Sequence, residues 1–281
     1  MVHLRVALFL MLTSYKVGGQ EPIRIDSYDS LMAYLINGAD VRYFFNTSIC
    51  GPSTFTSEPE TPVFGGEVKM FVAAHNTEEK QGQMTFSQVQ YIDENRKDLN
   101  EEIHAMWIVK EWALVSWGKP GFFMNNTDDL DVTECNWTKG EGSIWVKPHK
   151  EQKRLESFKE IQTLLTSGEE VRWAVNMSGC KCPPDPDDCG DGSLGNTIKD
   201  FNIMKDGSIS FSSSMIILLP FSWQYERLVA YGQIYQNNTA NFMISYLDPT
   251  AWNDGENGLT LCPITSDSSN SGGANFYTTG K

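Results

Sequence analysis

The chain contains an internal repeat at an offset of 130 residues. Residues 26–50 can be placed over residues 156–180 without a gap, and eight of the 25 positions are identical. Unrelated sequences of ordinary composition match at roughly one or two positions in a stretch of this length. The identical positions are Ser27, Leu35, Gly38, Val41, Arg42, Asn46, Ser48 and Cys50 in the first copy and Ser157, Leu165, Gly168, Val171, Arg172, Asn176, Ser178 and Cys180 in the second. The repeat predicts two copies of one folding unit.

Each copy begins with the pattern of a short helix followed by a strand. Ser157 and Glu160 form a capping box, and Gly168 stands where a helix ends in the left-handed conformation. Ser27 and Gly38 take the same places in the first copy. Alternating runs follow, whose apolar members are expected to face the core: Val41, Tyr43 and Phe45, and Val171, Trp173 and Val175. The predicted fold class is α+β, with two repeated units, each a short N-terminal helix packed on an antiparallel β-sheet or partial barrel.

The order of motifs is the same in both copies. A helix precedes Gly-x-x-Val, a strand ending in Ser-x-Cys, a Gly-Ser-hydrophobic-x-Phe hairpin, whose serine the first copy lacks, and a late cysteine. These motifs fall on Gly168, Val171, Ser178, Cys180, Gly207, Ser208, Phe211 and Cys262, and on Gly38, Val41, Ser48, Cys50, Gly82, Phe86 and Cys135. This order resembles the VirK-like family of small secreted domains. The resemblance implies the architecture of both halves and supplies no catalytic residue.

The ends of the chain and the join between the copies differ in composition from the repeats. Residues 1–19 have the order of a signal peptide, with a basic start, a short apolar run and small residues before Gln20. We therefore expect a secreted protein with units at 20–146 and 156–265, a linker at 147–155 and a disordered tail at 266–281. Lys153-Arg154 is a candidate dibasic processing site, although a solvated linker is the favoured interpretation.

Six cysteines suit an oxidising compartment. We predict the disulfides Cys50–Cys135, Cys180–Cys262 and Cys182–Cys189. The first two pairs span 85 and 82 residues and hold equal places in the two copies, and the third closes a short loop. The alternative in which Cys182 replaces Cys180 as the partner of Cys262 stays open.

Five N-x-Ser/Thr sequons accompany these cysteines, at Asn46, Asn125, Asn136, Asn176 and Asn237. Asn46 and Asn176 hold the same place in the two copies, on the strand face opposite the apolar set. We therefore expect both to point outward and to carry glycans.

The formal net charge of −14 disfavours binding to nucleic acids, because an acidic surface repels phosphate. No apolar run is long enough to span a membrane. The acidic loop Asp185, Asp187, Asp188 and Asp191 is a weak Ca²⁺ candidate, and an acidic surface loop is the favoured interpretation. Otherwise no metal or cofactor is expected, and no nucleophile, histidine-pair or phosphate-loop motif predicts a catalytic residue.

Trp107, Trp112 and Trp117 recur at intervals of five residues. On one strand this odd spacing alternates faces, so the three side chains cannot form one platform unless a bulge intervenes. Core packing is the favoured interpretation, and a tryptophan-lined cavity for an apolar or aromatic ligand is the alternative.

These features favour a non-catalytic, glycosylated, disulfide-stabilised protein that acts in an extracellular matrix, mucus, shell or body fluid. One alternative is a secreted oxidative enzyme of the luciferase type that acts on a small aromatic ligand. Another is a carrier of small molecules or carbohydrates. The sequence identifies no particular protein, glycan or small-molecule partner.

Overall fold

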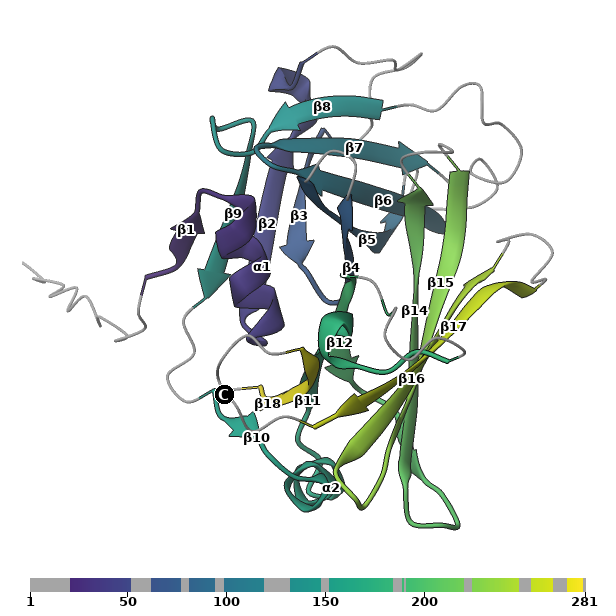
Figure 1. The fold of residues 1–281 in the computed structure, drawn as a ribbon. Coiled ribbons are helices and arrows are strands. Elements are labelled where there is room, and N and C mark those ends of the chain that lie inside the picture. The colour runs from purple at the N-terminus through teal and green to yellow at the C-terminus, as the bar shows by residue number, and fades with distance from the viewer. Residues whose placement is uncertain are drawn as a thin grey trace, which may run out of the picture.

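Figure 1 shows the fold in a computed structural model. It describes residues 21–51, 62–76, 81–93, 99–118, 132–147, 152–183, 189, 191–219, 224–247, 254–264 and 272–279. Antiparallel strands form three sheets of four, nine and five strands. Two α-helices and two 3-10 helices complete the described structure.

The first half runs from residue 23 to residue 147. Its elements are β1 (Ile23–Ile25), α1 (Tyr28–Ile36), β2 (Asp40–Asn46), the 3-10 helix η1 (Thr47–Ile49), β3 (Val63–Glu67), β4 (Phe71–Asn76), β5 (Gln81–Asp93), β6 (Leu99–Val109), β7 (Trp112–Gly118), β8 (Val132–Asn136) and β9 (Gly142–Lys147).

The second half runs from residue 154 to residue 278. Its elements are β10 (Arg154–Leu155), α2 (Phe158–Thr166), β11 (Val171–Asn176), the 3-10 helix η2 (Met177–Gly179), β12 (Ser193–Ile198), β13 (Phe201–Ile203), β14 (Ile209–Leu219), β15 (Gln224–Ile234), β16 (Thr239–Leu247), β17 (Asp254–Pro263) and β18 (Gly273–Thr278).

The strands of the two halves pair in the same order. In the first half, β1-β9-β2-β3 form one sheet, and β4 to β8 follow one another as a meander. In the second half, β10-β18-β11-β12 stand in the first order, and β13 to β17 form the second meander. β12 also pairs with β4, and this pairing creates the nine-stranded sheet from parts of both halves.

The helices begin and end where the sequence predicts. Ser27 and Ser157 cap them by accepting hydrogen bonds from the backbone N–H groups of Ser30 and Glu160. Gly38 and Gly168 follow the helices with φ angles of +74° and +83°, a region that glycine adopts at little cost. The apolar faces of β2 and β11 are buried as expected, with Val41, Phe45 and Val171 fully inaccessible.

The predicted α+β fold class is nevertheless wrong, because the chain is mostly β-sheet. Each helix has nine residues and covers little of the sheets beside it. The cores lie mainly between two sheets within each half: Phe45, Phe86 and Trp137 belong to the first, and Trp173, Phe211 and Phe242 to the second. Capping and periodicity located the helices correctly but gave no measure of how much sheet surface they cover.

The three disulfides are the predicted pairs, Cys50–Cys135, Cys180–Cys262 and Cys182–Cys189. The first joins the end of η1 to β8, and the second joins the end of η2 to β17. The two long disulfides therefore connect corresponding elements in the two halves.

Two boundaries predicted from composition are wrong. Residues 273–278, inside the predicted disordered tail, form the buried strand β18 beside β11. Arg154 and Leu155, inside the predicted linker, form β10 on the other side of β18. The candidate processing site Lys153-Arg154 therefore lies in hydrogen-bonded structure, where the Thr278 N–H donates to the Lys153 carbonyl.

Candidate functional site

Two of the three predicted tryptophans border an open hollow on one face of the first meander. The hollow has a volume of about 410 Å³ and is lined by Trp107, Val109, Lys110, Glu111, Trp112, Leu114 and Glu134. Trp112 is 42% exposed, which is unusual for so large an apolar side chain. Core packing is therefore the wrong interpretation for Trp112.

A tight turn explains why Trp107 and Trp112 share a face. Trp107 lies near the end of β6 and Trp112 begins β7, with Lys110 and Glu111 in the turn between them. In the antiparallel pairing, Trp112 is opposite Val109, and Leu114 is opposite Trp107. These cross-strand neighbours point to the same side of the sheet. The expectation of alternating faces failed because it treated residues 107–117 as one strand.

Trp117 lies on the opposite face, where it is the cross-strand neighbour of His104. It packs against the core of the first half, so the core interpretation holds for this tryptophan. The structure thus brings together two of the three predicted residues and adds Lys110, Glu111 and Glu134 at the hollow. Because Glu134 reaches the hollow from β8, local spacing gave no signal for it.

A polar cluster inside the first half surrounds His104, which is 1% exposed. Its Nε2 atom lies 3.2 Å from a carboxylate oxygen of Glu102, and its Nδ1 atom lies 3.2 Å from Nε2 of Gln88. The ring also packs against Phe64, with centroids 4.4 Å apart. Both ring nitrogens already have polar neighbours within the fold. This arrangement suits an internal link between β5 and β6 better than a base that faces a ligand.

Tyr43 adds a buried hydroxyl to the interior of the first half. Burial raises the pKa of Tyr43 well above its ordinary value, because the phenolate would lose its hydration. The group therefore stays protonated at physiological pH and is not a candidate base.

The sequons differ in accessibility. Asn46 and Asn176 sit at the starts of η1 and η2, where each side-chain oxygen accepts hydrogen bonds from the backbone N–H and the hydroxyl of the serine two residues on. Asn237 is exposed and makes the same pair of contacts with Thr239. Asn136 is 1% exposed and its amide nitrogen is buried, so the fold leaves no room for a glycan there. Asn125 lies outside the described residues.

The candidate calcium loop falls largely outside the described part of the chain. Asp185, Asp187 and Asp188 are not described, and Asp191 is exposed. Among the residues that are described, no group of three or more His, Cys, Asp or Glu side chains could hold a metal ion. None of the described helices is both long and apolar enough to cross a membrane.

Sequence inspection missed a row of side chains that crosses three strands in each half. Arg24 on β1 and Arg42 on β2 flank Trp145 on β9, and each arginine is directly opposite the tryptophan. In the second half the corresponding row is Arg154, Tyr277 and Arg172. Extending the repeat two residues upstream would have revealed its first member, because Arg24-Ile25 stands over Arg154-Leu155 at the same offset of 130.

Comparison with known proteins identifies part of the second half. Residues 154–252 match the model of the VirK protein family. This half contains a VirK domain. The match to VirK begins at β10 and extends past β16. No curated protein matches the chain.

One solved structure resembles part of the chain, the crystal structure of a VirK family protein from Legionella pneumophila. It is 12% identical in sequence, with a TM-score of 0.37, and the similarity covers 44% of this chain and 97% of that one.

Proposed function

We propose that this protein is a secreted, disulfide-stabilised, non-catalytic binding protein built from two VirK-like units. Its ligand is a small molecule with a flat apolar or aromatic part, held in the hollow beside Trp107 and Trp112. The protein acts in an extracellular fluid or matrix, in the role of a carrier. We infer this class of ligand because the two tryptophans line the same open hollow.

The proposal that the first half is a second VirK-like unit draws on its topology. Its strands pair in the order found in the half that contains the VirK domain. The long disulfides join corresponding elements, and the helices end at corresponding glycines. Agreement in sequence offset, strand order and covalent links is what duplication of one unit would produce.

Secretion is supported by the cysteines and by three of the sequons. All six cysteines are paired in disulfides, which persist in oxidising compartments. Peptide mapping of protein secreted from eukaryotic cells tests this part. We expect glycans at Asn46, Asn176 and Asn237, none at Asn136, and a mature chain that begins near Gln20. Retention of the chain inside the cells, or a glycan at Asn136, would contradict the proposal.

The size and lining of the hollow support a small ligand. Its volume of about 410 Å³ falls within the range of roughly 300–1,000 Å³ that is common for small-molecule sites. Trp107, Trp112 and Leu114 offer apolar surface on which a flat group can stack. Lys110 and Glu134 add charges of both signs at the same hollow, so the ligand is expected to have polar groups at its edge.

Titration with N-phenyl-1-naphthylamine tests the site without knowledge of the natural ligand. This neutral aromatic probe should become fluorescent on binding, and Trp112→Ala should weaken its binding at least about tenfold, as expected when a central aromatic contact is truncated. Trp145→Ala is the matched control, because it removes a partly buried tryptophan from another sheet. Equal binding to wild type and Trp112→Ala would refute the site.

The same preparation separates binding from catalysis. Candidate aromatic substrates incubated with the protein in air should be recovered unchanged and without light emission. A sustained rate of turnover, lost in Trp112→Ala and kept in Trp145→Ala, would replace the binding function with the oxidative enzyme.

A further inference from the structure

The two halves are in contact where β14 packs on β5 and β6, with Leu218 and Tyr225 against Ala105, and at three further places. β12 pairs with β4, with Ser193 opposite Ala73 and Gly195 opposite Phe71. The end of α1 lies on the row formed by Arg154, Tyr277 and Arg172. Glu67, at the end of β3, forms an ion pair with Arg172 at 2.5 Å.

The helix end is held by hydrogen bonds and by close packing. Arg172 donates to the backbone carbonyls of Gly38 and Ala39, and Gln152 donates to the Gly38 carbonyl. Gly38 lies so close to the Tyr277 ring that a β-carbon there would be 2.5 Å from Cδ2. The row in the second half therefore acts as a receptor for a helix end and a carboxylate.

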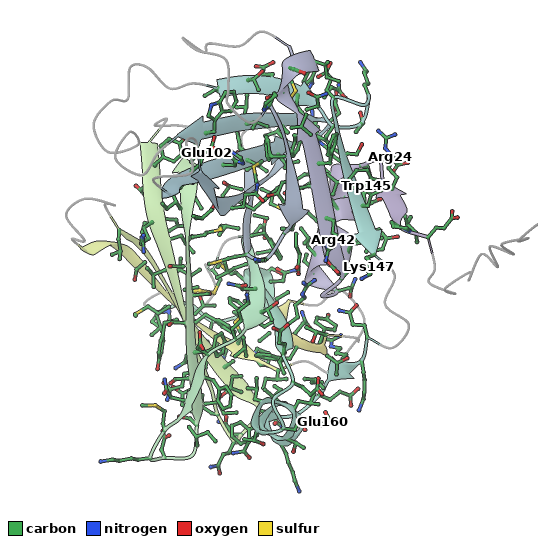
Figure 2. The ribbon with its side chains drawn as sticks, turned by 180° about the vertical axis from the view of Figure 1, so that it is seen from behind. Arg24, Arg42, Glu102, Trp145, Lys147 and Glu160 are labelled. Atoms are coloured by element: carbon green, nitrogen blue, oxygen red, sulfur yellow. A yellow bond between two sulfur atoms is a disulfide. The ribbon has the colours of Figure 1, made fainter. Side chains whose placement is uncertain are left out.

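The matching receptor in the first half is not occupied by described residues in this way. The Arg42 side chain is 51% exposed, whereas the corresponding Arg172 is 11% exposed. Figure 2 shows Arg24, Trp145 and Arg42 close together on one side of the molecule, with Lys147 beside them. β3, which corresponds to β12, is an edge strand of the four-stranded sheet, and its Val63 is 50% exposed.

In the described part of the second half, it is the helix end and the edge strand that lack a binding partner of this kind. Gly168, which corresponds to Gly38, is exposed and has open space where a β-carbon would stand. β13 corresponds to β4, yet it is an edge strand of the five-stranded sheet. Its Ile203 is 49% exposed. The second half therefore has a docking surface, formed by β13 and the end of α2, that is not bound to a receptor surface among the described residues.

We propose that these two surplus surfaces bind each other in separate copies of this chain, so that the molecules associate head to tail. The receptor surface is the β3 edge with Arg24, Trp145 and Arg42. The docking surface is the β13 edge with the end of α2. The register follows from the β12–β4 pairing: Val63 stands opposite Ile203, and Gly65 stands opposite Phe201.

Packing and charge fit this arrangement. The Phe71 ring covers Gly195 in the internal contact, and Phe201 and Gly65 hold the corresponding positions. Glu170 follows the end of α2 and would approach Arg24, Arg42 and Lys147 of the receptor surface, where Arg42 already lies 3.5 Å from Asp40. The Glu170 carboxylate takes the part that Glu67 has in the internal contact, since Thr197 stands at the place of Glu67 in β12.

Two different surfaces meet in such a contact, so each bound copy still exposes one unused receptor or docking surface. A symmetric dimer uses one self-complementary patch and stops at two chains, but a heterologous contact continues unless the rotation closes a ring. The proposal goes beyond ligand binding, because the hollow beside Trp112 plays no part in the contact.

Analytical ultracentrifugation of the secreted, disulfide-bonded protein tests the proposal with Val63→Lys and Ile203→Lys. Wild type should grow beyond two chains as its concentration rises. Each variant alone should stay monomeric, because Val63→Lys blocks the receptor and Ile203→Lys blocks the docking edge. An equimolar mixture should form particles of two chains and no larger, since each variant supplies the surface that the other lacks.

Leu259→Lys is the matched control, because Leu259 is 45% exposed on β17, the other edge of the five-stranded sheet. This variant should associate like wild type. Far-UV circular dichroism checks that all variants are folded. A monomeric wild type at every concentration, a variant that dimerises with itself, or a mixture that stays monomeric would each overturn the proposal.

Discussion

Gly38→Ala and Gly168→Ala make the same substitution at corresponding positions of the two halves. The two positions differ in their surroundings. Both glycines follow a helix with a positive φ, where an L-residue costs about 1–2 kcal/mol. At Gly168 nothing lies within 4 Å of the added carbon, so this conformational cost is the whole expected loss. At Gly38 the carbon would stand 2.5 Å from the Tyr277 ring, far inside the ordinary carbon–carbon contact of about 3.5–4.0 Å.

The overlap at Gly38 adds the cost of overpacking, about 1–3 kcal/mol, so Gly38→Ala should lose about 2–5 kcal/mol in the free energy of unfolding. Urea denaturation followed by tryptophan fluorescence and by circular dichroism measures both variants, and coincident transitions justify a two-state treatment. Equal losses in the two variants would refute the close contact between the end of α1 and β18. A larger loss at Gly168 would reverse the assignment of which helix end is docked.

Two further predictions concern stability. Replacing Cys180 and Cys262 by alanine should lower the free energy of unfolding by about 4–5 kcal/mol, against about 2 kcal/mol for Cys182 and Cys189. The reason is the entropy that each disulfide removes from the unfolded chain, since the paired cysteines are 82 and 7 residues apart. Urea denaturation of the two double variants should show the larger loss for Cys180 and Cys262. The backbone N–H of Glu156 and the ammonium group of Lys153 hold the pKa of Glu160 below its usual range. Its carboxylate therefore stabilises the fold at pH values above the unfolded pKa of about 4.3. The difference in stability between wild type and Glu160→Gln should vanish as the pH falls through the folded pKa. A difference that stays constant with pH would contradict this.

The sequence predicted the features that depend on local chemistry or on the repeat. Ser157 and Gly168 marked the ends of α2 correctly, because a cap requires particular residue types at fixed spacing. The pairing of Cys50 with Cys135 followed from the equal places of these cysteines in the two copies. Neither prediction needed knowledge of how the sheets pack.

The features that the sequence did not predict depend on contacts between distant segments. The pairing of β12 with β4 has no local signature, because any edge strand offers the same backbone groups. β18 was hidden by its Ser-, Gly- and Asn-rich neighbourhood, although Ala274 and Phe276 alternate with polar residues within it. A tryptophan-lined cavity was only the alternative interpretation, because the spacing was judged on one strand, whereas a tight turn, in which Lys110 has a φ of +50°, separates Trp107 from Trp112.

If the chain joins two copies of one unit, as we propose, corresponding positions in the two halves acquire different surroundings. If each copy has a receptor surface and a docking surface, one internal contact uses one of each and leaves the other two unused. The internal contact is favoured because the linker gives it a high effective concentration, whereas contact between molecules costs translational and rotational freedom. The net charge of −14 also opposes the approach of two copies. The end contact should therefore be weaker than the internal one, which makes assembly a property of concentrated protein and leaves the dilute chain monomeric.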